Sequence, residues 1–437
     1  MGKKVGYLYT NVSLVPTNPE QAISVNHFVM RAQVGAKVAE RSLKETRIFE
    51  AKPHGRLLSF VVEQAGDGGD QTLEGTATPT GLKVLQKRPG QPNQVRSLKP
   101  VKETVEDADQ ARVALIRKQA VEGIVTDGTD LESYRVVTTP GGTETRTIGG
   151  APVKVTKVTT LSDKEKVPAV AYLDEQGRML EIDFGGTMTA VQESEEKAKR
   201  FDTVEVFGLT RLVLPKPAPP EARNVPGQLT LDVTGLPEKF RIETYRQSFK
   251  VLDGGKVQIT LKAAPPKVKG KVRPLVDPNG GVNLKSTLAV EADSPEIAAA
   301  AKKIVGTEKD AYVAAKKIVA WVNQSLQKDY GSSSDRATDV LRIRKGDCTE
   351  HSLLAVALLR AAGIPAKRID GVVYLMNEDK VPALYWHEWV EAYVGEWTQL
   401  DPTFGQDVAD ATHLALGEEG SAEITPLIGG LKVVDVR

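Results

Sequence analysis

The hydrophobic pattern of this 437-residue chain changes sharply at Ser294. Before that residue, short apolar stretches alternate with polar residues and are broken by Gly, Pro and Asp, as in RLLSFVVEQ and AVAYLDEQGRMLEIDF. Alternation with one polar face is typical of antiparallel strands in a sandwich or an open barrel. After Ser294, apolar residues recur at helical spacing. The sequence therefore predicts a multi-domain protein, β-rich in its N-terminal and middle regions, with an α+β C-terminal domain.

The length fits two or three domains. The Pro-rich segment PKPAPPEA, which starts at Pro215, favours an extended linker. We therefore expect a β-rich domain over 1–214, a small β unit or annex over 221–291 and a third domain over 294–437. Within the first domain, Val113, Ile116, Ala120 and Ile124 recur at helical spacing and predict one helix over 108–124.

The third domain opens with helices whose ends can be read in the sequence. Ser294 can cap a helix and Gly306 can close it. Thr307 and Asp310 resemble a capping box before the next apolar stretch. A third helix is predicted over 337–344.

Composition excludes several classes of partner. The formal net charge is +1, so no global field attracts nucleic acid or an anionic membrane. No stretch approaches 18 consecutive apolar residues, and we expect no transmembrane segment. The basic segment KVKGKVR is short, flanked by Pro and without aromatic residues, which favours a linker over a nucleic-acid site.

Cys348 is the single cysteine of the chain, which excludes an internal disulfide and a thiolate zinc cluster. It lies at the start of a strongly apolar helical stretch that Gly363 and Pro365 end. A thiol at a helix N-terminus meets free backbone N–H groups and the positive end of the dipole, which favour the thiolate. A lone cysteine in an apolar helix is more often a packing residue, so both interpretations stay open at this point.

A histidine and an aspartate lie on the two strands of a predicted hairpin around Gly395. With a three-residue loop, Ala392 pairs with Glu396 and His387 stands opposite Asp401. Side chains in that relation are close enough for the carboxylate to hold the imidazole, although a register error of one residue would separate them. A thiol, an imidazole base and an orienting carboxylate are the groups that nucleophilic acyl transfer needs.

The runs GDCTEHSLLAVALLRAAGIPAKRIDG and YWHEWVEAYVGEWTQLDPT resemble the catalytic core of the transglutaminase-like superfamily, whose fold is similar to that of papain-type cysteine proteases. The resemblance covers about 295–404. It implies that Cys348 is the nucleophile, His387 the general base and Asp401 the residue that orients it.

The resemblance also implies acyl transfer on peptide or carboxamide carbonyls through a Cys348 thioester, with a protein or peptide substrate and no cofactor. Bacterial cores of this kind are more often hydrolytic, so hydrolysis by a protease or amidase is favoured over crosslinking. The alternative from another class is an inactive scaffold that binds a peptide or a cell-surface polymer. Residues 1–210 resemble a β-rich region of some exported bacterial proteins. This likeness favours export with the leader absent from this chain, and a cytoplasmic location is the alternative.

Several residues are weaker candidates for contact with the substrate or its oxyanion: Gln324, Tyr330, His351 and Trp386. The backbone N–H of Cys348 is the first candidate for the oxyanion hole, and the side chain of Gln324 or Tyr330 could add a donor. His351 shares a helical face with Cys348 and is more readily explained as a partner of the helix start. Trp389 is expected in the core.

The remaining histidines carry no site prediction. His27, His54 and His413 have no Cys or carboxylate pattern around them and are expected at surface or loop positions. No DxDxDG loop occurs, and we expect no metal site.

Overall fold

The computed structural model describes residues 4–34, 37–66, 70–127, 131–164, 167–185, 188–201, 204–205, 210–329, 334–376, 379–418, 427 and 429–437. The chain forms two compact units. One comprises Met1–Gln33 and Val38–Val204, and the other comprises Val34–Lys37 and Glu205–Arg437. Among the described residues, no helix has the length and apolar character needed to cross a membrane.

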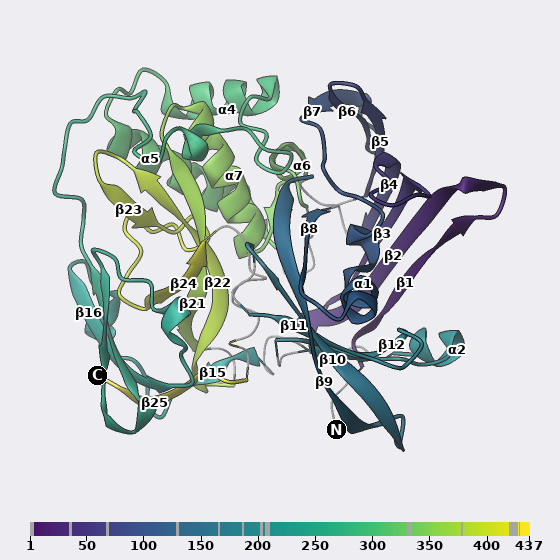
Figure 1. Ribbon diagram of the computed structural model, residues 1–437. Helices are drawn as coiled ribbons and strands as arrows, with labels where there is room; N and C mark the ends of the chain where they lie inside the picture. Colours follow the sequence, from purple (N-terminus) through teal and green to yellow (C-terminus); the bar gives the residue numbers. More distant parts are fainter. Residues whose placement is uncertain are drawn as a thin grey trace. The chain divides into compact units, whose positions relative to one another are not determined.

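The larger antiparallel sheet of the first unit follows chain order, so that each strand pairs with the next (Figure 1). Its strands are β1 (Gly6–Val15), β2 (Asn18–Val34), β3 (Lys37–Glu50), β4 (Leu57–Gly66), β5 (Gln71–Thr78), β6 (Gly81–Lys87) and β7 (Gln94–Leu98). Alternate side chains such as Val62, Leu73 and Val84 are buried. This pattern confirms the predicted antiparallel strands with one buried face.

A second antiparallel sheet of the first unit runs from β13 back to β8. Its strands are β8 (Val121–Thr126), β9 (Ser133–Ile148), β10 (Ala151–Ser162), β11 (Ala169–Leu173), β12 (Met179–Phe184) and β13 (Met188–Val191). The short α2 (Glu195–Ala198) and β14 (Val204–Glu205) follow in the chain.

The helix predicted over 108–124 is shorter in the structure. A 3-10 turn, η1 (Asp107–Asp109), leads into α1 (Gln110–Arg117), which ends because Lys118 adopts a left-handed conformation with φ 54°. The predicted last turn belongs instead to β8. Ile116, assigned to the buried face, is 71% exposed. The spacing of the four apolar residues therefore predicted too long a helix, because the last of them, Ile124, pairs with β9 as part of β8.

The second unit holds the sheet that carries the candidate site. Its antiparallel strands lie in the order β15 (Leu212–Val213), β22 (Pro382–Tyr393), β21 (Ala366–Met376) and β24 (His413–Glu418), and β23 (Trp397–Leu400) also pairs with β22. A second sheet has the order β17 (Gln247–Val251), β18 (Val257–Ala263), β16 (Gly227–Thr234) and β25 (Lys432–Val436). The last strand of the chain thus pairs with a strand of the middle region.

Shorter elements connect these sheets. β19 (Gln327–Lys328) and β20 (Lys345–Gly346) form a short parallel pair. The 3-10 turns are η2 (Pro220–Arg223), η3 (Glu238–Phe240), η4 (Asp253–Gly255) and η5 (Val282–Leu284).

The helices of the second unit are α4 (Pro295–Val305), α5 (Ala311–Ser325), α6 (Ala337–Ile343) and α7 (Cys348–Ala361). The predicted ends of α4 are confirmed, because the Ser294 side chain accepts from the Glu296 N–H and Gly306 has φ 58°. The N-cap of α5 is Asp310, which accepts from the Val313 N–H at 2.9 Å, and the prediction that Thr307 begins this helix is wrong.

Helix α7 is the centre of the second unit's core (Figure 1). Leu354, Val356 and Leu358 are fully buried, and α4, α5 and α6 pack around the helix. On its sheet side α7 meets Val390 and Ala392 of β22. Because successive side chains of a strand point to opposite faces, His387 and Trp389 project from the other face of β22. The buried helix thereby fixes the position of its own N-terminal residue, Cys348, relative to that strand.

Candidate active site

Cys348 is the first residue of α7, and its place is set by a capping box. The Asp347 side chain accepts from the Thr349 N–H at 2.8 Å, and the Glu350 side chain accepts from the Asp347 N–H at 2.8 Å. Two of the otherwise unpaired N–H groups at the helix start are thereby satisfied. A Cβ on Gly346 would lie 2.2 Å from Glu350 Cβ, so glycine is required for this close approach.

The start of α7 is fastened to the strand that carries His387. Ser352, one helical turn after Cys348, donates from Oγ to the backbone oxygen of Glu388 at 3.0 Å. The backbone N–H of Glu388 in turn interacts with the Cys348 thiol. Since Glu388 follows His387 directly, the half-buried Cys348 lies beside the backbone of the predicted base.

His387 is held by Asp401. His387 Nε2 lies 2.8 Å from Asp401 Oδ2, and the two residues are 7% and 0% exposed. The ring also stacks on Phe404, with centroids 4.9 Å apart. With Nε2 bound to the carboxylate, Nδ1 is the ring nitrogen left for the thiol. Among the described residues no hydrogen bond joins the Cys348 thiol to His387, a contact that in many enzymes tightens only when substrate binds.

The hairpin brings His387 and Asp401 together in a register that differs from the predicted one. The observed pairs are Tyr393 with Trp397 and Ala392 with Thr398. Ala392 therefore does not pair with Glu396, and Asp401 is not directly opposite His387. The observed register is shifted by two residues from the predicted one. Because side chains on a strand alternate between faces with a period of two, His387 and Asp401 still lie on one face, as diagonal neighbours.

Backbone donors hold the other oxygen of the Asp401 carboxylate. Asp401 Oδ1 accepts from the N–H groups of Thr403 at 2.6 Å and Phe404 at 3.0 Å. Burial raises the pKa of this carboxyl, but the neighbouring histidines, His387 first, outweigh burial and hold the pKa far below its usual range. Asp401 is therefore an anion that accepts hydrogen bonds on both oxygens.

His413 is a residue of the site that the sequence interpretation missed. It was expected at the surface, yet it begins β24 with 0% exposure, and its Nε2 lies 2.9 Å from the same Asp401 Oδ2. The sequence signal that could have placed His413 in the interior was the alternating run ATHLALG, which is typical of a strand. Of the other two histidines, His54 is exposed in a loop as expected, whereas His27 is half-buried in β2.

The weaker candidates differ in their burial and in their hydrogen bonds. His351 is fully buried and holds the helix start, with Nδ1 2.6 Å from the Asp347 backbone oxygen. Gln324 is exposed on α5, while its neighbour Asn323 donates to the Thr403 backbone oxygen at 2.8 Å.

The two tryptophans of β22 also differ in their burial. Trp386 is half-buried and donates from Nε1 to the Thr210 backbone oxygen at 2.9 Å. Trp389 is fully buried, which confirms its predicted place in the core. Tyr330, the other oxyanion candidate, lies outside the described residues.

The electrostatic surroundings of Cys348 differ from those expected at a helix N-terminus. Burial, then the Asp347 and Glu388 carboxylates, raise the pKa of the thiol well above its ordinary value. Burial and the opposing Asp370 in turn raise the pKa of Glu388, despite the Arg368 guanidinium. The resting thiol is therefore neutral, and the favourable effect of the helix dipole is outweighed by burial and nearby carboxylates.

His387, Asp401 and His413 offer ligand atoms within 4.8 Å of one another, a spacing that a metal ion could use. In this structure, Asp401 Oδ2 itself lies between the two imidazole nitrogens, at 2.8 and 2.9 Å. The three side chains thus satisfy one another by hydrogen bonds.

Comparison with known protein families bears on the same region. Residues 298–402 match the model of the transglutaminase-like superfamily. A candidate cysteine protease from Cytophaga hutchinsonii is 17% identical with a TM-score of 0.33, covering 49% of this chain and 83% of that chain. The periplasmic domain of TgpA from Pseudomonas aeruginosa is 15% identical with a TM-score of 0.28, covering 45% and 87%. A search of curated proteins finds no match.

The matched region contains Cys348, His387 and Asp401 and ends one residue beyond the aspartate. Residues 298–402 therefore form a transglutaminase-like domain in the C-terminal region of this chain.

Proposed function

We propose that this chain is a thiol-dependent acyl-transfer enzyme that acts on peptide or carboxamide carbonyls and uses water as its usual acceptor. The observation that carries the proposal is the buried His387 Nε2 to Asp401 Oδ2 hydrogen bond on the strand beside Cys348. A thiol, a base and an orienting carboxylate in that order are the minimum that such chemistry needs. We further propose that 1–214, 221–291 and 294–437 are its domains.

The proposed reaction begins with proton transfer from Cys348 Sγ to His387 Nδ1. The sulfur attacks the carbonyl carbon, and the Cys348 backbone N–H, unpaired within the helix, can donate to the oxygen as it becomes negative. The carbon–nitrogen bond then breaks, and the His387 imidazolium gives its proton to the leaving amine. Water, deprotonated by His387, attacks the thioester, releases a carboxylic acid and restores the thiol.

Water and amine acceptors follow the same path as far as the thioester. The half-buried position of Cys348 supports hydrolysis, because an enzyme that transfers to an amine has to shield the thioester from water. We expect incubation with a mixture of proteome-derived peptides in ¹⁸O-water and a biotinylated primary amine to give ¹⁸O in newly formed carboxyl groups. The Cys348→Ala variant is the control. Biotin incorporation without ¹⁸O would assign crosslinking instead, and the absence of both labels would contradict an enzymatic role.

An inactive binding scaffold is the second candidate, and the raised pKa of Cys348 favours it. The two candidates differ in whether His387 assists the thiol. An enzyme needs His387 for acylation of Cys348 by an activated ester such as p-nitrophenyl acetate, whereas a scaffold would react at the same slow rate with and without the imidazole. The comparison of wild type with His387→Ala therefore separates them.

The pH dependence of alkylation tests the electrostatics of the thiol. Iodoacetamide reacts with the thiolate, and the chain has one cysteine, so mass spectrometry reports Cys348 alone. Since burial and carboxylates raise its pKa, we expect a midpoint above about 8.5, the ordinary value. Asp347→Asn removes one negative charge and keeps a capping side chain, so its midpoint is expected roughly one pH unit lower. A wild-type midpoint at or below the ordinary value would contradict this account.

A further inference from the structure

His413 lies between two carboxylates in the interior of the second unit. Its Nε2 is 2.9 Å from Asp401 Oδ2, and its Nδ1 is 3.1 Å from Asp410 Oδ1. All three residues are at most 1% exposed. Asp401 Oδ2 also contacts His387 Nε2. A continuous chain of hydrogen bonds therefore runs from Asp410 through His413 and Asp401 to the proposed base.

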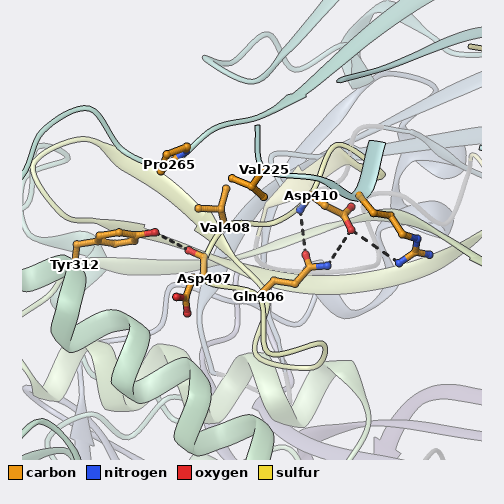
Figure 2. Close-up of a pocket in the computed structure, with 8 residues that line it drawn as sticks. Val225, Pro265, Tyr312, Gln406, Asp407, Val408 and Asp410 are labelled. Carbon is orange, nitrogen blue, oxygen red and sulfur yellow. Dashed lines mark hydrogen bonds and ion pairs between the residues drawn. The ribbon is translucent and has the colours of Figure 1, made fainter. Parts of the chain in front are cut away.

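The hydrogen bonds around Asp410 show that it is an acceptor. Its Oδ1 accepts from the N–H of Thr412 at 2.9 Å, and its Oδ2 accepts from Gln406 Nε2 at 2.9 Å (Figure 2). The Arg223 guanidinium lies 3.9 Å from Oδ2. Asp401 likewise accepts backbone N–H groups on Oδ1. With an anionic acceptor facing each ring nitrogen, both nitrogens of His413 have to donate, and only an imidazolium carries two N–H groups.

We propose that His413 is a positioning residue of the candidate active site: a buried imidazolium, clamped between Asp401 and Asp410, that holds the Asp401 carboxylate against His387. The charge state of His413 does not depend on the proposed function, whereas its effect on the reaction rests on that function. In agreement with the geometry, burial lowers the pKa of His413, but hydrogen bonds and charge from Asp401 and Asp410 outweigh burial and raise it overall.

The remaining charged groups around His413 come from several elements. Arg246, 3% exposed and just before β17, donates to the backbone oxygens of Asp410 at 2.6 Å and His413 at 3.4 Å. Its charge opposes the imidazolium, while the two carboxylates favour it. His387 on β22 also lies beside the ring. Other charged or titratable groups act on its partners: Arg223 on η2 lies beside Asp410, His351 on α7 interacts with Asp401, and Glu391 interacts with Arg246. The two carboxylates in direct contact dominate because the other charges have no hydrogen bond to the ring.

A cation at His413 changes what Asp401 does to His387. A positive charge whose ring centre is 5.7 Å from that of His387 balances the negative charge of Asp401 beside the proposed base. Asp401 can then hold the His387 ring in place without a net negative charge beside it. Removing the charge of His413 is expected to shift the pH dependence of Cys348 acylation.

Nuclear magnetic resonance of the full chain tests the charge state directly. The chain has five histidines, so selective ¹⁵N-histidine labelling gives few side-chain signals. We expect one histidine, identified by its loss in His413→Gln, to keep both ring nitrogens in the imidazolium range at pH 8. A neutral tautomer of His413 at pH 7 would overturn the proposal, and this experiment needs neither substrate nor a destabilising variant.

Two variants act on the charge in different ways. His413→Gln is neutral and keeps an N–H donor for Asp401, whereas Asp410→Asn removes the negative charge that faces His413 Nδ1 and keeps an amide oxygen there to accept from Thr412. In both we expect the pH midpoint of Cys348 acylation by p-nitrophenyl acetate to rise by about one to two pH units, because positive charge beside the site is lost or weakened. Asp407→Asn, a loop carboxylate whose side chain is 53% exposed, is the control and is expected to leave this midpoint unchanged. A residue that only packs would lower stability without moving the pH midpoint of acylation, and that result would contradict the proposal.

The same samples separate this proposal from two other outcomes. A stoichiometric metal ion in the purified protein, with histidine signals that change on chelation, would replace the imidazolium with a metal site. Failure of peptide turnover, with His413 protonated and the pH midpoint of Cys348 acylation shifted as expected, would reject the proposed function and keep the charge state of His413.

Discussion

Cys348→Ala is expected to lower turnover of a peptide or carboxamide substrate by about four to six orders of magnitude. Alanine has no nucleophile, so no thioester forms, and what remains is binding and the donors around the carbonyl oxygen. The half-buried site loses only a small sulfur atom, so the fold is expected to persist. The measurement is kcat/KM together with mass spectrometry of the intact chain, in which the acyl adduct of the wild type is absent from the variant.

Cys348→Ser is the matched variant, because it keeps a side chain of similar size with a much less acidic nucleophile. We expect it to bind substrate and to turn over far more slowly than the wild type. Circular dichroism and thermal unfolding of both variants test whether the fold is unchanged. Substantial turnover by Cys348→Ala would remove Cys348 from the mechanism.

The helical part of the second unit could be predicted closely, because its signals are local. The Ser294 cap, the Gly306 end and the start of α7 at Cys348 each depend on residues within one turn of the helix end. The first unit's helix shows the limit of such signals. Apolar spacing alone extended it into β8, since spacing does not reveal that a neighbouring strand pairs with those residues.

The pairing of His387 with Asp401 was predicted from a wrong register. The hairpin loop is displaced by one residue on each strand, and the pair survives because the total shift of two keeps both side chains on one face. A total shift of one would have placed them on opposite faces. The sequence thus predicted correctly on which face of the sheet each side chain lies, but not which residue stands directly opposite it.

The surroundings of the pair could not be predicted, because they come from distant parts of the chain. Arg246 reaches Gln399 across 153 residues, and Gln247 exchanges hydrogen bonds with the Ala415 backbone. The sequence placed these two residues only within the small β unit expected over 221–291. Similarly, no local pattern reveals that His413 shares Asp401 with His387, since that contact depends on how β24 packs beside β21.

Asp401→Asn is expected to lower kcat/KM by about four orders of magnitude while the thiol remains in place. The amide oxygen of the new side chain can replace Oδ1 as the acceptor for the Thr403 and Phe404 backbone N–H groups. Its NH₂ group then faces His387 Nε2, so Nε2 has to accept and the ring proton moves to Nδ1. With a proton on Nδ1, His387 cannot take one from Cys348, which is the wrong tautomer for a base.

The same substitution removes an anion from His413, whose Nε2 then also faces a donor. We therefore expect His413 to lose a proton, to donate from Nδ1 to Asp410 alone and to show a neutral ring in ¹⁵N spectra. Asp407→Asn in the same loop is the control for both measurements and is expected to keep full activity, because its side chain is exposed. Wild-type kcat/KM in Asp401→Asn would show that Asp401 does not set the tautomer of His387. An imidazolium at His413 in that variant would show that Asp401 is not what keeps the ring charged.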